Sequence, residues 1–433
     1  MATTHLRSAR DRPLSALDDP AHPDFPDPLI DLDDLLSGGP PPDGIPSIDY
    51  PLFQPVSEVN WLDDDEPVLS LTIDGQTKAY PIRIMTWHEI VNDRLAAVPV
   101  ALTYCPLCNS GVAFERTVLG ETTTVKVSGK LYADNLVMYD RLTESLWPQL
   151  TGRASVGALT GTQLESIPVG AVGWGQFRQE HPDARVLTRS TGHDRDYLTN
   201  PYVGYDDPDS EPLFALPTGP DTRLPVKARV VGVGEGESAV AVPRDLLAEQ
   251  GVQHVEVGPD RVVLWHVPGQ VSALDTQLIP DGAEIGSVAA FLADVDGQTL
   301  DFARAEDGTF RDRQTGSVWN LFGRAVNGPL SGQRLTAVEH LDTFWFAWAA
   351  FEPGTRLVAA SRGPTPPPRV SPQRVSQLHE RRCLDVRGRE VRRVVTARSV
   401  DPGRGQTGTT RTVDVPGMHR DEHRILRLDA THF

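Results

Sequence analysis

Two of the three cysteines in this 433-residue chain, Cys105 and Cys108, are separated by only two residues, the first of which is a proline. They stand in TYCPLCNSGVAF, from Thr103 to Phe114. Thiolate sulfur is a ligand for Zn, Cu and Fe, and two neighbouring thiols can also exchange with a disulfide. Three cysteines are too few for a disulfide framework, so this C-x-x-C points to metal binding or redox chemistry. The alternative is that both cysteines are small buried hydrophobic residues.

The residues around the cysteine pair predict a turn between two strands. Pro106 fixes φ and removes a backbone donor, and Asn109 and Gly111 suit left-handed backbone. A C-P-x-C at a hairpin tip resembles the knuckle of rubredoxin-like and zinc-ribbon sites, in which both sulfurs face one ion. It differs from the thioredoxin arrangement, in which C-x-x-C opens a helix. We expect the two sulfurs to lie within about 4 Å of each other.

The sequence has no second knuckle, so a metal at Cys105 and Cys108 needs ligands of other types. His88 is the first candidate, because its predicted helix runs into the strand that delivers Cys105, and Glu89 and Asp140 come next. A site with two cysteines and one histidine suits Zn or Cu, and Fe also stays open. The alternative is that His88 bonds to a backbone group among core residues of its own helix.

Polar and aromatic residues elsewhere are candidates for binding a ligand. Some flank the cysteines, some lie in VSGKLYADNLVMYDR, and some lie in the polar loop from Arg189 to Asp207, a candidate lid or ligand rim. The alternatives are a decorative loop and, for the Asp-Arg pair, a lock between a turn and a strand. The candidates are Tyr104, Asn109, Tyr132, Tyr139, Asp140, Arg141, Tyr197 and Tyr202.

Hydrophobic patterning predicts a fold rich in strands. Val68 to Ile73 and the residues after Asp74-Gly75 carry a hairpin signature, and Val98 to Tyr104 reads as a buried strand. GVAFERTV and TTTVKVSG predict a second hairpin. The stretch from Ile84 to Leu95 has helical spacing. These elements predict an α+β, β-rich fold in which two strands present the cysteine turn.

The chain also repeats itself. DRLTESLW, from Asp140 to Trp147, returns as DRQTGSVW, from Asp312 to Trp319, and Trp174 returns as Trp345. The period is far longer than that of a solenoid repeat, so each copy is the size of a domain. We therefore expect two tandem copies of one β-hairpin-rich unit, related by a pseudo-twofold axis. The second copy lacks the cysteines, which makes the first copy the candidate for function.

Four segments follow from this organisation. Residues 1–40 are rich in Pro and Asp and predict a flexible arm. Residues 41–216 form the first half, with the His-Glu and C-P-x-C motifs, and residues 217–360 form a second, degenerate half. Residues 361–433 are rich in Arg and Pro and predict a disordered tail.

Composition and missing motifs exclude several classes of protein. A formal net charge of −18 argues against nucleic-acid binding by the core. The longest apolar run, from Phe344 to Phe351, is too short to span a membrane, and no secretory signal is seen, so we expect a cytoplasmic protein. The sequence contains no phosphate loop, dinucleotide fingerprint, nucleophile elbow or H-E-x-x-H motif.

Several of these stretches together resemble the prokaryotic domain-of-unknown-function family 3179. They are DGIPSIDYP at 43–51, AYPIRIMTWHEIVND at 79–93, TYCPLCNSGVAFER at 103–116, VSGKLYADNLVMYDRLTESLWPQ at 127–149, and the NPYVGYD block. The resemblance covers roughly residues 40 to 360. It implies that the His-Glu and C-P-x-C segments matter, and it implies no substrate.

Two functions compete at this point. The first is a metal-binding or thiol-redox protein that uses the C-P-x-C knuckle and His88, with Zn, Cu or Fe as the possible metal and a redox partner or small molecule as its target. The second is a non-catalytic module that binds a small molecule or a protein. Whether the chain is an enzyme stays open.

Overall fold

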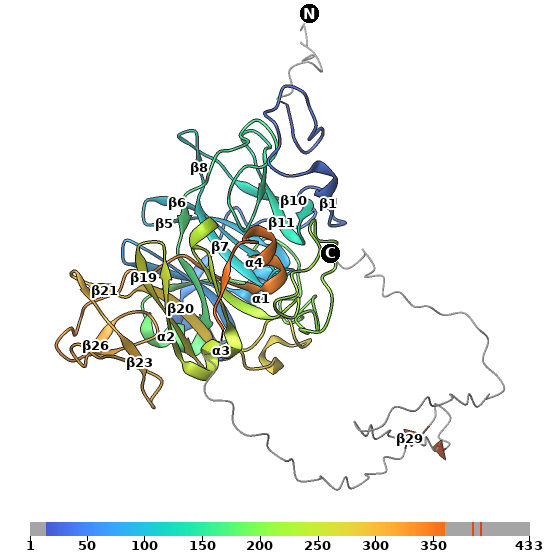
Figure 1. Cartoon of the computed structure of the whole chain (residues 1–433). Helices are drawn as coiled ribbons and strands as arrows, with labels where there is room; N and C mark the ends of the chain where they lie inside the picture. The colour runs from blue at the N-terminus through green and yellow to red at the C-terminus, as the bar shows by residue number, and fades with distance from the viewer. Residues whose placement is uncertain (1–13, 360–382, 385–389, 392–433) are drawn as a thin grey trace, which may run out of the picture. The chain divides into compact units, whose positions relative to one another are not determined.

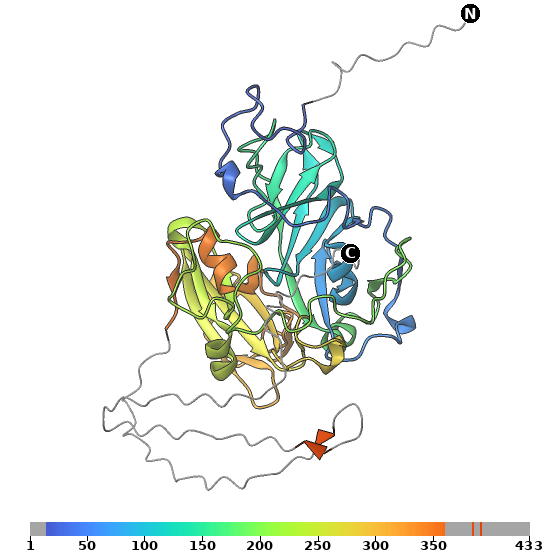
Figure 2. The same cartoon turned by 90° about the vertical axis from the view of Figure 1, so that its right-hand side faces the viewer.

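The structure, a computed structural model, describes residues 14–359, 383–384 and 390–391. Residues 1–360 fall within a single unit, whose described part contains both predicted halves. The first half is drawn in blue to green beside the second half in yellow to orange (Figure 1, Figure 2). The predicted tail lies outside the described residues, apart from the strands β29 (Cys383–Leu384) and β30 (Glu390–Val391).

Strands dominate both halves, as the sequence predicts, and the described residues include four α-helices. None of these helices has the length and apolar character that crossing a membrane requires. The α-helices are α1 (Ile82–His88), α2 (Trp174–Glu180), α3 (Arg244–Gln250) and α4 (Trp345–Phe351). The short 3₁₀ helices are η1 (Leu32–Asp34), η2 (Val56–Glu58), η3 (Gly236–Ser238) and η4 (Ile279–Asp281).

One sheet of the first half has the strand order β14-β3-β4-β15-β2. β3 and β4 are the predicted hairpin, and its turn residues Asp74 and Gly75 have φ of 49° and 75°, as a tight hairpin turn requires. β15 lies parallel to β4. The strands are β2 (Phe53–Pro55), β3 (Pro67–Ile73), β4 (Gln76–Pro81), β14 (Val169–Gly173) and β15 (Arg185–Leu187).

Two further sheets of the first half build the region around the cysteines. Their strand orders are β13-β7-β6-β5 and β1-β10-β11-β12. The first consists of β5 (Ile90–Leu95), β6 (Val98–Cys105), β7 (Ser110–Glu115) and β13 (Ser166–Ile167). The second consists of β1 (Leu36–Ser37), β10 (Val125–Tyr132), β11 (Asn135–Asp140) and β12 (Leu146–Pro148), and a small hairpin joins β8 (Thr117–Val118) to β9 (Glu121–Thr122).

The second half has a sheet of order β27-β16-β17-β28, in which β28 lies parallel to β17. Its other sheets have the orders β18-β19-β20, β21-β22 and β23-β24-β25-β26. The strands are β16 (Arg229–Val233), β17 (Val240–Pro243), β18 (Val252–Val257), β19 (Asp260–Val267), β20 (Ser287–Leu292), β21 (Asp294–Val295), β22 (Gln298–Thr299), β23 (Phe302–Arg304), β24 (Phe310–Asp312), β25 (Val318–Trp319), β26 (Ala325–Asn327), β27 (His340–Phe344) and β28 (Arg356–Leu357).

The predicted helix from Ile84 to Leu95 is wrong in its second part. The helix ends at His88, because Glu89 adopts a φ of 57° and breaks the helical path. Residues 90–95 form β5, which pairs with β6 along its whole length. The β-branched Ile90 and Val91 are fully buried, and burial between sheet neighbours favours a strand over continuation of the helix.

The predicted flexible arm is also wrong for residues 14–40. Ala16 is fully buried and packs with Tyr139 and Val156, together with apolar side chains between Leu17 and Leu35. β1 pairs with β10 and extends its sheet. The many prolines of this segment prevent regular helix, but they do not prevent a loop from burying its apolar side chains on the sheet.

The two halves share a strand order and a local lock. In each half a three-strand antiparallel sheet is followed by a fourth strand that runs parallel to its neighbour. Trp147 Nε1 donates to Asp140 at 3.0 Å, and Trp319 Nε1 donates to Asp312 at 2.9 Å. Superposition of the two complete halves stays a prediction.

We expect the two locks to contribute equally to stability. Asp140→Asn and Asp312→Asn each remove the charge that accepts these buried hydrogen bonds, so each is expected to lower the free energy of unfolding by about 1–2 kcal/mol. Urea denaturation of the two variants measures both values. A large loss of unfolding free energy in one variant and none in the other would show that the two repeated aspartates contribute differently to stability.

Candidate functional site

The cysteines occupy the tip between β6 and β7, as the sequence predicts. β6 ends at Cys105, and Asn109 N donates to Pro106 O at 3.2 Å, which closes the turn. Asn109 takes a φ of 52°, a left-handed conformation that asparagine tolerates. Both cysteines are free thiols, and their Sγ atoms lie 3.1 Å apart, within the expected separation.

The turn between β10 and β11 surrounds the sulfurs with hydrogen-bonding groups. Asn135 Nδ2 donates to Cys108 Sγ at 3.1 Å, and Leu136 N donates to Cys105 Sγ at 3.4 Å. Cys105 and Cys108 are 1% and 0% exposed. Burial raises the pKa of the Cys108 thiol well above its ordinary value, so this sulfur keeps its proton while the site is closed.

Asp134 contacts Cys108 through its backbone and carries a buried carboxyl group. Its backbone O accepts from Cys108 Sγ at 3.4 Å, and its Oδ2 accepts from Tyr205 Oη at 3.0 Å and from Leu213 N at 3.1 Å. Oδ1 is buried and has no hydrogen-bond partner among the described residues. Burial raises the pKa of Asp134 to about 7, so the carboxyl can exchange a proton near neutral pH.

Glu89 is a second buried carboxyl in this region. It is 6% exposed, and burial raises its pKa to about 8. Glu89 ends α1 with a φ of 57°, whereas Gly251 ends α3 in the second half with a φ of 75°. A glutamate held in a conformation that favours glycine points to a role for its side chain rather than to local stability.

His88 does not join the cysteines as a metal ligand in this structure. Its ring is fully buried, with Nδ1 bonded to Pro46 O at 2.7 Å and Nε2 bonded to Tyr197 Oη at 2.6 Å. Burial lowers the pKa of His88 to about 4, so the ring is neutral at neutral pH. Because Pro46 O can only accept, Nδ1 carries the ring proton, and Nε2 uses its lone pair to accept from Tyr197 Oη.

The predicted metal set of Cys105, Cys108, His88 and Glu89 therefore gains no support. Across residues 14–359 no group of three or more His, Cys, Asp or Glu side chains is arranged to hold a metal ion. Two thiolates alone do not complete the four-coordinate site that Zn prefers. What the turn does bring together is a pair of thiols with hydrogen-bond donors and one neighbouring carboxyl.

The eight predicted ligand residues do not form one site. Tyr104 and Asn109 lie at the cysteine turn, where Tyr104 Oη donates to Asn109 Oδ1 at 3.1 Å, and Tyr202 packs against the core cluster that contains both cysteines. Tyr132 and Tyr139 belong to another cluster, around Ala16. The carboxylate of Asp140 is saturated by its own turn, Arg141 pairs with Asp43, and Tyr197 bonds to His88.

A long loop, residues 189–216, packs over the cysteines, and we call it the covering loop. Its Tyr205 is buried in the cluster with both cysteines, joined by the partly buried Phe214 and Leu216. Lys227 Nζ lies 3.5 Å from the centre of the Tyr205 ring and donates to Tyr205 O at 2.8 Å. The predicted lid or ligand rim, residues 189–207, is part of this loop, and its role stays a prediction. The covering loop contacts Asp134 through Tyr205 Oη and Leu213 N.

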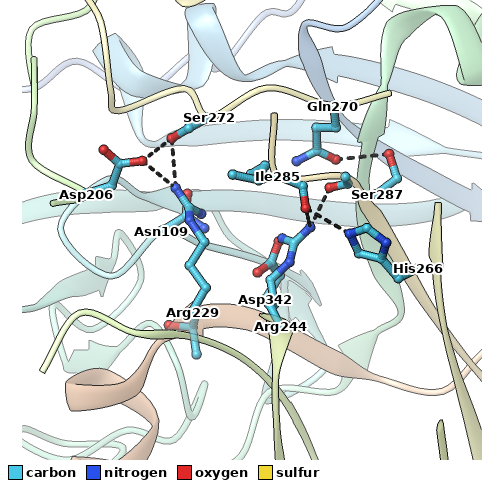
Figure 3. A network of polar contacts seen from close by, with 12 residues as sticks. Asn109, Asp206, Arg229, Arg244, His266, Gln270, Ser272, Ile285, Ser287 and Asp342 are labelled. Atoms are coloured by element: carbon cyan, nitrogen blue, oxygen red, sulfur yellow. Dashed lines mark hydrogen bonds and ion pairs between the residues drawn. The ribbon is translucent and has the colours of Figure 1, made fainter. Parts of the chain in front are cut away.

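Sequence reasoning missed the contribution of the second half. β27 contacts the cysteine turn through two hydrogen bonds. Phe344 N donates to Cys108 O at 3.0 Å, and Thr343 Oγ1 donates to the same atom at 2.8 Å. Next to the turn, two ion pairs, Arg244–Asp342 and Arg229–Asp206, belong to a buried polar network (Figure 3). One signal in the sequence could have indicated this network: the charged Arg244 directly follows the apolar run VAVP.

A family model described as "Protein of unknown function (DUF3179)" matches residues 42–355. The chain belongs to the DUF3179 family. Searches of curated proteins and of solved structures gave no match. The matched region of this DUF3179 chain contains the cysteine turn, Glu89, Asp134, the covering loop and β27, so the site lies wholly within the family domain.

Proposed function

We propose that this chain is a dithiol–disulfide redox protein whose reacting groups are Cys105 and Cys108. The observation that carries the proposal is a pair of unbonded sulfurs 3.1 Å apart on a tight turn, in a region where residues 14–359 form no group of three or more metal-ligating side chains. Two sulfurs this close need only a small movement to reach the bonding distance of a disulfide. The same pair offers a metal only half of a tetrahedral site.

The reaction is a pair of thiol–disulfide exchanges. One cysteine thiolate attacks a sulfur of the oxidant, a disulfide R–S–S–R′, forms a mixed disulfide and releases R′–S⁻. The second cysteine then displaces R–S⁻ and closes the Cys105–Cys108 disulfide. The chain loses two electrons and two protons, and the oxidant gains both as two thiols. Reduction runs the same steps in reverse.

Asp134 is the proton acceptor in this proposal. Its carboxyl lies on the residue whose backbone oxygen accepts from Cys108 Sγ, and its Oδ1 has no partner among the described residues. A carboxyl with a pKa of about 7 is suited to take a proton from a buried thiol near neutral pH. Asn135 Nδ2 and Leu136 N then stabilise the thiolates by donating to them.

The covering loop controls access in this proposal. Exchange requires an oxidant to reach sulfurs that are at most 1% exposed. Release of Tyr205 Oη and Leu213 N from Asp134 Oδ2 would detach the loop and free the carboxyl at the same time. The second half serves as support through β27, which accords with a duplicated scaffold in which only the first copy kept its reactive turn.

Oxidation of the full-length chain tests the proposal. After treatment with oxidised glutathione, intact-mass analysis is expected to show the loss of two hydrogen atoms, and dithiothreitol is expected to restore them. Cys105→Ser and Cys108→Ser are expected to abolish this change, whereas Cys383→Ser, the matched control, is expected to keep it. A chain that forms no disulfide between positions 105 and 108 under these conditions would overturn the redox proposal.

Metal analysis of the same untagged preparation distinguishes the metal-binding hypothesis. The redox proposal expects substoichiometric Zn, Cu and Fe in both the unmodified chain and Cys105→Ser. Stoichiometric metal that disappears in Cys105→Ser would show instead that the thiols are ligands.

A further inference from the structure

An apolar groove of about 420 Å³ runs between the two halves. β14 contributes Val169 and Gly170 to one wall, and β20 contributes Val288, Ala290 and Phe291 to the other. The volume lies within the range of small-molecule sites, which are commonly apolar with a few polar groups that orient the ligand. The groove therefore has the size and lining of a binding site rather than of a packing defect.

A small polar cavity adjoins this groove. Its volume is about 20 Å³, room for a single water-sized group, and it shares Val169 and His340 with the groove. Its polar lining comes from Tyr104 and Asn109 at the cysteine turn and from Gln270, His340 and Asp342 of the second half. A ligand that extends from the groove into the cavity would thus place one end beside the polar groups of the cysteine turn.

Asp342, which lines this cavity, has one carboxylate oxygen without a hydrogen-bond partner among the described residues. Its side chain is 9% exposed and pairs with Arg244 through Oδ2, while Oδ1 has no partner among the described residues. A buried acceptor without a partner is costly, so the position favours a group that donates a hydrogen bond. The network around Asp342 and Arg244 is visible in Figure 3.

Two amide side chains supply donors to the same cavity. Asn109 Oδ1 accepts from Tyr104 Oη at 3.1 Å, and Gln270 Oε1 accepts from Ser287 Oγ at 3.2 Å. Their amide nitrogens make no hydrogen bond within residues 14–359, and both residues line the cavity. A group that fits between Asp342 and these amides must both donate and accept.

We propose that the groove binds a small apolar molecule that carries one hydroxyl group, with the hydroxyl in the polar cavity. The hydroxyl donates to Asp342 Oδ1 and accepts from the amide of Asn109 or Gln270. An ammonium group is disfavoured because Arg229 and Arg244 lie in the same network, and a carboxylate is disfavoured by Asp342 itself. The inference does not depend on the redox chemistry of the cysteines.

Calorimetric titration with 4-butylphenol and 4-butylanisole tests the inference. The two probes share an apolar body, and only the phenol can donate to Asp342. The phenol is expected to bind at least about tenfold more tightly, because one unmet buried hydrogen bond is worth about that factor. Equal affinity for the two probes would overturn the role of the hydroxyl, and no binding of either would overturn the site.

Two variants locate the binding. Gly170→Leu is expected to abolish binding of both probes, because an added Cβ finds its nearest atoms, His340 Cε1 and Val288 O, at 3.9 Å, which leaves room for the side chain in the groove. Gly354→Leu, where a Cβ meets nothing within 4 Å, is the control and is expected to bind normally. Binding that survives Gly170→Leu in a protein of normal melting temperature would place the probe elsewhere.

Discussion

Replacement of Arg244 by methionine is expected to lower the free energy of unfolding by about 3–5 kcal/mol, the range found when one partner of a buried ion pair is removed. Arg244 is 4% exposed at its side chain and pairs with Asp342. Its guanidinium also donates to Ile285 O at 2.8 Å and to Gly286 O. Methionine fills much of the volume but leaves Asp342 buried without its counter-charge, so most of the cost is electrostatic.

The matched control is Arg141→Met, because Arg141 also pairs with a single aspartate, Asp43. That pair is 43% and 38% exposed, so solvent screens it and the loss is expected to stay below about 1 kcal/mol. Urea denaturation of both variants gives the two values. Similar losses in both would contradict the claim that burial makes the loss of the Arg244–Asp342 pair costly.

A second large effect concerns pH. Between pH 6.5 and 8 the contribution of Glu89 to the free energy of unfolding is expected to fall by about 1.5–2 kcal/mol. Burial raises the pKa of Glu89 from 4.5 to about 8, so the folded chain holds this proton more tightly than the unfolded chain. The resulting stability is fully present below pH 4.5 and is lost as the pH rises to about 8, at about 1.4 kcal/mol per pH unit.

Other buried groups also titrate and determine which pH range is suitable for the measurement. Burial raises the pKa of Asp134 from 3.8 to about 7, so Asp134 adds to the fall only up to about pH 7. Burial lowers the pKa of His88 from 6.5 to about 4, so its stabilisation is lost as the pH falls through that range, opposite to the carboxyls. The pKa values of His181, His254 and His340 are lowered in the same sense. The pKa of His266 is lowered as well. An ordinary histidine is half protonated at pH 6.5, so these histidines still oppose the carboxyls in the lower part of the window.

Glu89→Gln tests this assignment. Relative to the unmodified chain, the free energy of unfolding of the variant is expected to rise by about 1.5–2 kcal/mol between pH 6.5 and 8, because the variant lacks the titration of Glu89. Glu58→Gln, at an exposed position, is the control and is expected to follow the unmodified chain. Denaturation is measured under reducing conditions at several pH values. A Glu89→Gln variant as pH-dependent as the unmodified chain would show that another group is responsible.

The cysteine turn could be predicted from sequence because its determinants are local. Proline, asparagine and glycine act on the backbone within a few residues, so Pro106 and Asn109 fix the hairpin tip whatever surrounds it. The hairpin at Asp74-Gly75 was predictable for the same reason. The helix from Ile84 was misjudged at Glu89, where pairing of residues 90–95 with β6 outweighs the local helical spacing.

The buried polar network next to the cysteine turn could not be predicted, because it depends on contacts between residues that are far apart in the sequence. Arg244 and Asp342 are 98 residues apart, and Asp206 and Ser272 are 66 apart. Nothing within either segment reveals its partner. The contacts of His88 could not be predicted for the same reason. Local sequence predicts its helix, but its bonds to Pro46 and Tyr197 come from loops 42 and 109 residues away.

The hydrogen bond from Thr343 to Cys108 has a consequence for biosynthesis. The two residues are 235 positions apart, so the ribosome makes the cysteines long before it makes β27. At an elongation rate of about 5–20 residues per second, that delay is roughly ten to fifty seconds. During this interval the nascent chain carries its thiol pair without the strand that later holds the turn. The order of synthesis thus leaves both cysteines exposed before the protein can enclose them.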